Sequence, residues 1–183
     1  DEKESLFARG GYFFIITYGF VIATITLIGF LLFPTIHIVE NGMAFTLANL
    51  KQVYEIDGML RLSQSTAFSV LGVSQLFHMI GMTNTEKSFV HVFKSKNWLL
   101  LVAFVFGLGM QILITEVPFL ESFFSTAELT FVEWMYVLAL SVVPLVIHEI
   151  IVLVKFIKKV IKKRKILNIS FQTVDKYSNL KRR

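Results

Sequence analysis

Four long apolar stretches divide this chain, and they constrain its fold more than any other feature. They cover residues 11–33, 65–82, 98–115 and 132–156. A hydrocarbon core about 30 Å thick requires roughly 20 helical residues to cross it, and a helix satisfies its own backbone polar groups in lipid. The sequence therefore predicts an all-α fold, an integral membrane bundle of four transmembrane helices.

The composition supports membrane spans and leaves little room for anything else. Hydrophobic residues make up 55% of the chain, charged residues 17%, and the mean hydropathy is +0.67. A soluble domain is usually less apolar than this. We expect one membrane domain over residues 1–157 and a basic tail over residues 158–183. Because cysteine is absent, disulfides, thiolate metal sites and cysteine nucleophiles are excluded.

The distribution of basic residues predicts the orientation. Of the 18 Lys and Arg residues, all but Lys51 and Arg61 lie before the first stretch, between the second and third, or from Lys155 onward. Four spans would place these three segments on one side of the membrane. Basic residues favour the cytoplasmic side, so both termini are expected there. The loop over residues 116–130 contains three glutamates and no basic residue, which suits the opposite side.

The tail begins with an alternation of apolar and basic residues over positions 155–165. Such a pattern can extend the fourth helix along an anionic leaflet, where each basic residue near the surface contributes about 1 kcal/mol. Anionic lipid is therefore an expected partner of the tail. A plain stop signal and a regulatory segment are the other two interpretations.

A few polar side chains interrupt the apolar stretches. Gln75 and His78 are spaced so that they share one helix face. The amide oxygen of Gln75 suits a hard cation such as calcium, whereas the simpler interpretation is a hydrogen bond between helices. His148 and Glu149 follow Pro144 closely, which is compatible with a proton relay or with packing. Small residues that permit close helix approach are Gly19, Ala23, Gly29, Gly72, Gly107 and Gly109.

No catalytic constellation is recognisable in the sequence. A glycine-rich phosphate loop, a soluble nucleotide domain and a nucleophile with its base are all missing, so the chain alone is expected to perform no chemistry. No nucleic-acid partner is expected either. Residues 34–62 should form a loop outside the membrane with a short surface helix.

Several short motifs resemble the carboxy-terminal membrane region of P-type cation-transporting ATPases, the bacterial calcium-type pumps above all. They are the charged segment 1–7, residues 65–68 with 74–78, Asn97-Trp98-Leu99, Glu116-Val117-Pro118-Phe119-Leu120, Glu133-Trp134, and Pro144. The resemblance implies a four-helix support for the ion-transport helices in a multi-pass protein of the bacterial cell membrane. Its partners would be the remaining helices and cytoplasmic domains of the pump.

The resemblance also bears on ligands. It implies ATP and Mg²⁺ as cofactors of the whole pump, with none bound by this chain, and calcium or another cation as the transported ion. At the position of Gln75, related calcium pumps with two sites supply a carboxylate, which implies at most a peripheral cation-ligand role for this amide. The first residue is Asp1 and not methionine, which suggests a fragment.

Two other functions remain open from the sequence alone. One is a free-standing four-helix accessory protein that interacts with other membrane proteins. The other is a small redox protein in which His78 and His148 bind a haem between two helices.

Overall fold

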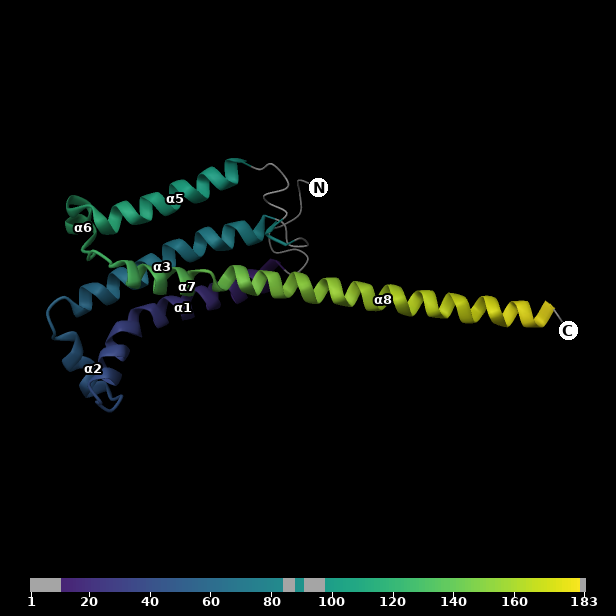
Figure 1. Ribbon diagram of the computed structural model, residues 1–183, viewed down its shortest axis with the longest axis horizontal. Coiled ribbons are helices and arrows are strands. Elements are labelled where there is room, and N and C mark those ends of the chain that lie inside the picture. The colour runs from purple at the N-terminus through teal and green to yellow at the C-terminus, as the bar shows by residue number, and fades with distance from the viewer. Residues whose placement is uncertain (1–10, 84–87, 91–97, 182–183) are drawn as a thin grey trace.

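The computed structural model describes residues 11–83, 88–90 and 98–181, with side chains up to residue 164. Within these ranges all regular structure is helical, which confirms the all-α expectation for this part (Figure 1). Expectations about segment 1–7, most of the loop over residues 83–97 and the side chains after residue 164 lie outside the described residues. The helices are α1 (Gly11–Glu40), α2 (Leu47–Tyr54), α3 (Met59–Met82), α5 (Trp98–Glu116), α6 (Pro118–Phe124), α7 (Phe131–Ser141) and α8 (Val143–Lys181).

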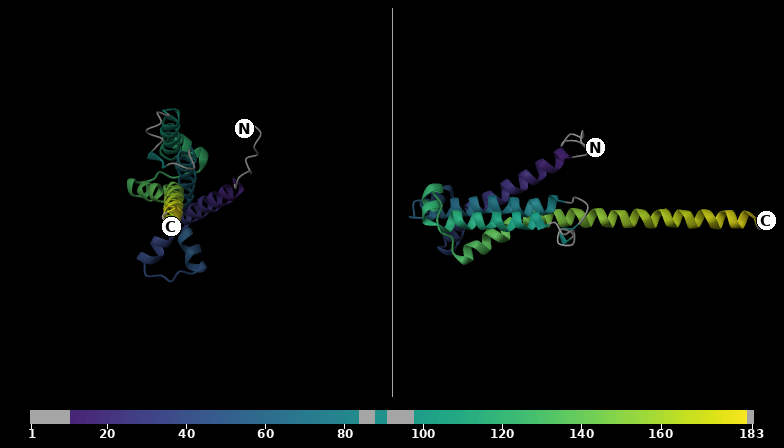
Figure 2. Two further views of the ribbon diagram at one scale, coloured as in Figure 1. Left: turned by 90° about the vertical axis from the view of Figure 1, so that its right-hand side faces the viewer. Right: turned by 90° about the horizontal axis from the view of Figure 1, so that it is seen from above.

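The long helices lie side by side and form a bundle with two distinct ends (Figure 1). We call the end from which α8 extends the tail end, and the opposite end, where α2 and α6 lie, the far end. Helix α1 begins at the tail end, and α5 begins there too (Figure 2). The first described residues and the departing tail are therefore at the same end of the bundle.

Within the described residues, three helical segments are long and apolar enough to cross a membrane. They are Gly11–Glu40, Trp98–Glu116 and Phe131–Arg164. Helix α3, which contains the second apolar stretch, is not among them. It contains many serine and threonine side chains, and these lower its mean hydropathy. Four spans therefore remain a prediction.

Helix α3 is the centre of the bundle, which explains its polar composition. It contacts α1, α5, α7 and α8, and its Val70 and Val73 form an apolar cluster with Ile25 of α1 and Val137 of α7. Its small polar residues are fully buried inside the bundle: Ser63, Ser65, Thr66, Ser69 and Ser74. Some of them bond to the helix itself, as when Thr66 Oγ1 donates to the Leu62 carbonyl at 2.8 Å. Small side chains here allow four neighbours to approach one helix.

Five glycines were predicted to allow neighbouring helices to approach closely, and at three of them a side chain of another helix does lie close. A Cβ on Gly29 of α1 would lie 3.1 Å from Cγ2 of Val70, and one on Gly107 of α5 would lie 2.7 Å from Cδ2 of Leu76. Gly72 of α3 touches the side chain of Gln111. The expectation was wrong for Gly19 and Gly109, because a Cβ on either would meet nothing within 4 Å in the described structure.

Helix α1 continues beyond its expected end at residue 33. Pro34 is buried inside the helix, and the helix ends only at Glu40. Proline removes one backbone donor and commonly kinks a helix, but packing around Pro34 can sustain the turns that follow. The termination signal is Asn41-Gly42, since Gly42 adopts φ +64° and the Met43 N–H donates to the Ile38 carbonyl at 3.0 Å.

The expected short surface helix is present as α2. The Thr46 hydroxyl caps it by accepting from the Asn49 N–H at 3.2 Å. The ring of Tyr54 lies 5.5 Å from the ring of Phe30, centroid to centroid, which holds α2 against α1. Residues 34–40 and 59–62 of the expected loop belong instead to α1 and α3.

The fourth apolar stretch forms two helices. The Thr130 hydroxyl and the Glu133 carboxylate build a capping box at the start of α7. The helix ends at Ser141, and after Val142 the chain resumes as α8 with Pro144 in its first turn. Proline is tolerated in a first turn because no helical acceptor is available there for its missing N–H. Helix α8 then runs unbroken to Lys181, so the tail does extend the fourth helix.

Candidate functional site

Gln75 lies on the side of α3 that the described chain leaves open. The exposed residues of this side follow helical spacing and form what we call the open stripe, which consists of Gln64, Phe68, Leu71 and Gln75. An amide exposed at membrane depth is costly in lipid and normally faces protein or a water-lined cavity. The open stripe therefore needs a protein neighbour more than a lipid one.

Gln75 and His78, which were predicted to share one face of α3, differ in how far other helices cover them. His78 is half-buried, and its ring centroid lies 4.4 Å from that of Tyr18 on α1. Gln75 makes no such contact and remains exposed. The spacing of the two residues is helical as predicted, but α1 packs against His78 and leaves Gln75 exposed.

No cation site is complete within the described residues. Among them, no group of three or more His, Asp or Glu side chains is arranged to hold a metal ion. One neutral amide is too weak to bind calcium, which takes six to eight oxygen ligands. Any cation that Gln75 contacts must receive its other ligands from outside this part of the chain. The role of Gln75 stays a prediction.

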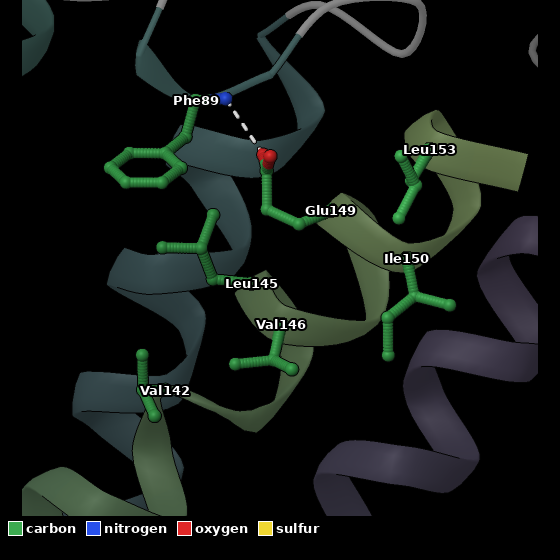
Figure 3. A pocket seen from close by; sticks show the side chains of 7 residues that line it. All are labelled: Phe89, Val142, Leu145, Val146, Glu149, Ile150 and Leu153. Carbon is green, nitrogen blue, oxygen red and sulfur yellow. Dashed lines mark hydrogen bonds between the residues drawn. The ribbon is translucent and has the colours of Figure 1, made fainter. Parts of the chain in front are cut away.

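At the tail end, His148 and Glu149 join α8 to its neighbours. His148 is 4% exposed and packs so closely on Gly81 of α3 that a Cβ there would lie 3.1 Å from its Cγ. Glu149 accepts a hydrogen bond from the backbone N–H of Phe89 at 2.7 Å, which ties the segment after α3 to α8 (Figure 3). These contacts support the packing interpretation that the sequence left open beside a proton relay.

An apolar cavity of about 410 Å³ opens beside this contact. The side chain of Glu149 stands at its edge, and apolar side chains of α8 line its floor (Figure 3). The lining residues are Phe89, Val142, Leu145, Val146, Glu149, Ile150 and Leu153. Because the carboxylate already accepts from a backbone donor, the cavity presents mainly hydrocarbon to any occupant.

At the far end, Glu116 is the centre of a hydrogen-bond network that the sequence analysis missed. Its Oε1 accepts from Trp134 Nε1 at 3.0 Å, from the Leu129 N–H at 3.3 Å and from Thr115 Oγ1 at 3.4 Å. Beside it, Ser65 Oγ accepts from the Ala127 N–H at 2.6 Å. One carboxylate thus connects α5 with the loop before α7 and with α7 itself. The available signal was a glutamate that ends an apolar stretch beside a proline, with a tryptophan downstream.

In the middle of the bundle, Gln111 joins α5 to α3, and the sequence analysis missed it as well. The side chain is 8% exposed. Its Nε2 donates to Ser69 Oγ at 3.3 Å, while its oxygen lies against Gly72. A single amide within an otherwise apolar stretch was the signal, since such groups in membranes usually bond across helices.

The polar groups of the described residues thus hold helices together at both ends and in the middle, and they build no reaction centre there. The molecule is of the class of integral membrane helix bundles. Residues 1–154 match the family model described as cation transporting ATPase, C-terminus. The chain belongs to this family, the carboxy-terminal membrane region of P-type cation ATPases, as its motifs had indicated.

A curated relative is similar over most of this chain. "Calcium-transporting ATPase 1" of Bacillus cereus is 35% identical over 153 residues, which cover 84% of this chain. The chain spans 17% of the length of that relative. No solved structure matches the chain.

Proposed function

We propose that this chain is the four-span carboxy-terminal support of an ATP-driven calcium pump in a bacterial cell membrane. The open stripe of α3 is the observation that favours a support over a free-standing accessory protein. Gln75, the exposed amide within its apolar stretch, requires a protein neighbour, and the chain spans only 17% of its relative, so the same polypeptide can supply one. ATP and Mg²⁺ would bind in that other part. The packing of His78 and His148 into helix contacts disfavours a haem between them.

Helix α3 is the fourth span in this proposal. Its 24 residues give a length of about 36 Å, enough to cross the hydrocarbon core. Because its serines and threonines are buried among neighbouring helices, lipid does not meet them. The tail end, which is rich in Lys and Arg, would face the cytoplasm, and the glutamates of the far end would face outward.

The topology predicts opposite accessibility for two engineered cysteines, and the chain contributes no other. Ser125→Cys at the far end should react with a membrane-impermeant maleimide added to intact cells, and Lys159→Cys at the tail end should react only after the cells are opened. Labelling of both before opening would contradict a membrane crossing by α7 and the start of α8, which lie between the two positions. If only Lys159→Cys were labelled before the cells are opened, the orientation would be the opposite of the proposed one.

The ligand proposal predicts a specific effect of Gln75→Ala on the intact pump. If the amide is a peripheral calcium ligand, the calcium concentration for half-maximal ATPase activity should rise about fivefold, or about 1 kcal/mol, with little change in maximal rate. Gln64→Ala is a matched control, since it removes the same side chain from the same stripe three turns away. Equal responses of the two variants, or none in Gln75→Ala, would remove the ligand role. An ATPase that does not respond to calcium would remove calcium as the transported ion.

A further inference from the structure

The first turns of α8 beyond the bundle occupy a defined depth. Trp134, at the far end, bonds to Glu116, and 21 residues separate it from Lys155. Along α7 and α8, at about 1.5 Å per residue, this path is about 32 Å, which is an upper bound on the distance because the two helices are divided at Val142, and it is close to the thickness of a hydrocarbon core. Residues 155–164 therefore occupy about the next 14 Å, which includes the headgroup region on the tail side. We call these ten residues the basic collar.

The basic collar has two chemically different faces. Helical spacing places Lys155, Lys158, Lys159, Lys162 and Lys163 on one face. The other face consists of Phe156, Ile157, Val160 and Ile161, with Arg164 among them. The phenyl ring of Phe156 is 63% exposed and the Ile161 side chain is 60% exposed. A surface that is both this apolar and this basic fits a partner that offers hydrocarbon and negative charge together.

The charges of the basic collar are largely uncompensated by the described chain. Lys155 Nζ lies 5.4 Å from the centroid of the Phe14 ring, and this contact holds the first turn of the collar against α1. The other cations of the collar have no hydrogen bond or ion pair within the described residues. No acidic residue occurs between Glu149 and Asp175 in the sequence. Positive charge is thus concentrated where α8 leaves the membrane.

We propose that the basic collar binds anionic phospholipid of the leaflet at the tail end, with its lysines on the headgroups and the apolar side chains of its first turn at the boundary of the hydrocarbon core. The proposal rests on the proposed membrane topology, because only that topology places the collar at the headgroups. A leaflet is favoured over a protein groove because α8 is continuous with its span and α1 holds its first turn, so the collar cannot move away from the lipid. Long lysine side chains reach headgroups from this position.

The test uses the intact pump with a fluorophore on Ile161→Cys, in a background without other reactive cysteines. The labelled pump is reconstituted in phosphatidylcholine vesicles with increasing phosphatidylglycerol. Brominated phosphatidylglycerol should quench the fluorophore at least about threefold more than brominated phosphatidylcholine at the same content, and salt should weaken the preference. The joint variant Lys158→Gln, Lys159→Gln, Lys162→Gln, Lys163→Gln should quench equally with both lipids.

A charge-preserving variant separates charge from lysine chemistry. Replacing the same four lysines by arginine should keep the preference for phosphatidylglycerol. Equal quenching by both lipids in the parent would overturn the proposal, because the collar would then insert without headgroup recognition. A shielded fluorophore that neither lipid quenches would also overturn it and indicate a protein partner. The readout needs no transport, so a failure of the calcium proposal leaves this result interpretable, and a failure of the topology would appear in the cysteine labelling.

Discussion

Replacing Glu116 by alanine should lower the free energy of unfolding of the intact pump by about 3 kcal/mol. Two donors, Trp134 Nε1 and the Leu129 N–H, would lose their shared acceptor, whereas Thr115 Oγ1 can still donate to the Ile112 carbonyl at 3.1 Å. Leaving a buried donor without a partner costs about 1–3 kcal/mol, and partial exposure at this site reduces the cost of each. The measurement is the thermal midpoint of the purified pump, which is the temperature at which half of its monodisperse chromatographic peak is lost.

Two further variants distinguish the network from a general effect of charge. Glu116→Gln keeps an oxygen that can accept, so it should lose only about 1 kcal/mol. Glu128→Ala removes an exposed carboxylate from the same loop and should leave the midpoint unchanged. If Glu116→Ala and Glu128→Ala melt at the same temperature, the network contributes nothing to stability.

Gly72→Ala should cost about 2 kcal/mol of stability, although it adds a single methyl group. The methyl would occupy the position of the Gln111 side-chain oxygen. Gln111 is buried, so the end of its side chain can move away from the methyl group only by giving up its bond to Ser69. Overpacking of this kind typically costs about 1–3 kcal/mol. The same thermal assay measures it.

The companion variants are a second glycine and a double mutant. Gly109→Ala changes a glycine of α5 whose Cβ would meet nothing within 4 Å of the described structure, so it should be neutral or slightly stabilising. Gly72→Ala combined with Gln111→Ala should be less destabilised than the sum of the two single changes, because the second removes the atoms that the first displaces. Additive effects in the double mutant would contradict the contact.

The positions of the long helices were predictable from the sequence, whereas helix α6, which lies within the expected loop over residues 116–130, and several helix limits were not. The stretch 98–115 nearly coincides with α5, since its length and hydrophobicity are sufficient to predict a helix there. Helix α1 continues past its expected end at residue 33 because Pro34, inside the helix, removes only one hydrogen bond, which packing can offset. The fourth stretch behaves differently. It is divided at Val142, and Pro144 lies in the first turn of the new helix α8.

Only those features of the candidate site that depend on the spacing of residues along one helix were predictable from the sequence. Gln75 and His78 do follow one another on neighbouring turns of α3, but whether each is covered depends on α1, which is distant in sequence. The partners of Glu116 and Gln111 are just as remote from any local pattern. Gln111 bonds to Ser69, 42 positions earlier, and Glu116 bonds to Trp134, 18 positions later. Such pairs follow from the arrangement of the helices and not from their periodicity.

The buried serines of α3 have a consequence for biosynthesis. Helix α3 is made before α5, α7 and α8, so when it leaves the ribosome most of the neighbours that will cover its hydroxyl groups do not yet exist. Its own hydropathy favours insertion into lipid less than that of the three helical segments that are long and apolar enough to cross a membrane. If α3 spans the membrane as proposed, its stable insertion should depend on sequence translated later, so that the carboxy-terminal half of this chain would act as a folding partner for its centre.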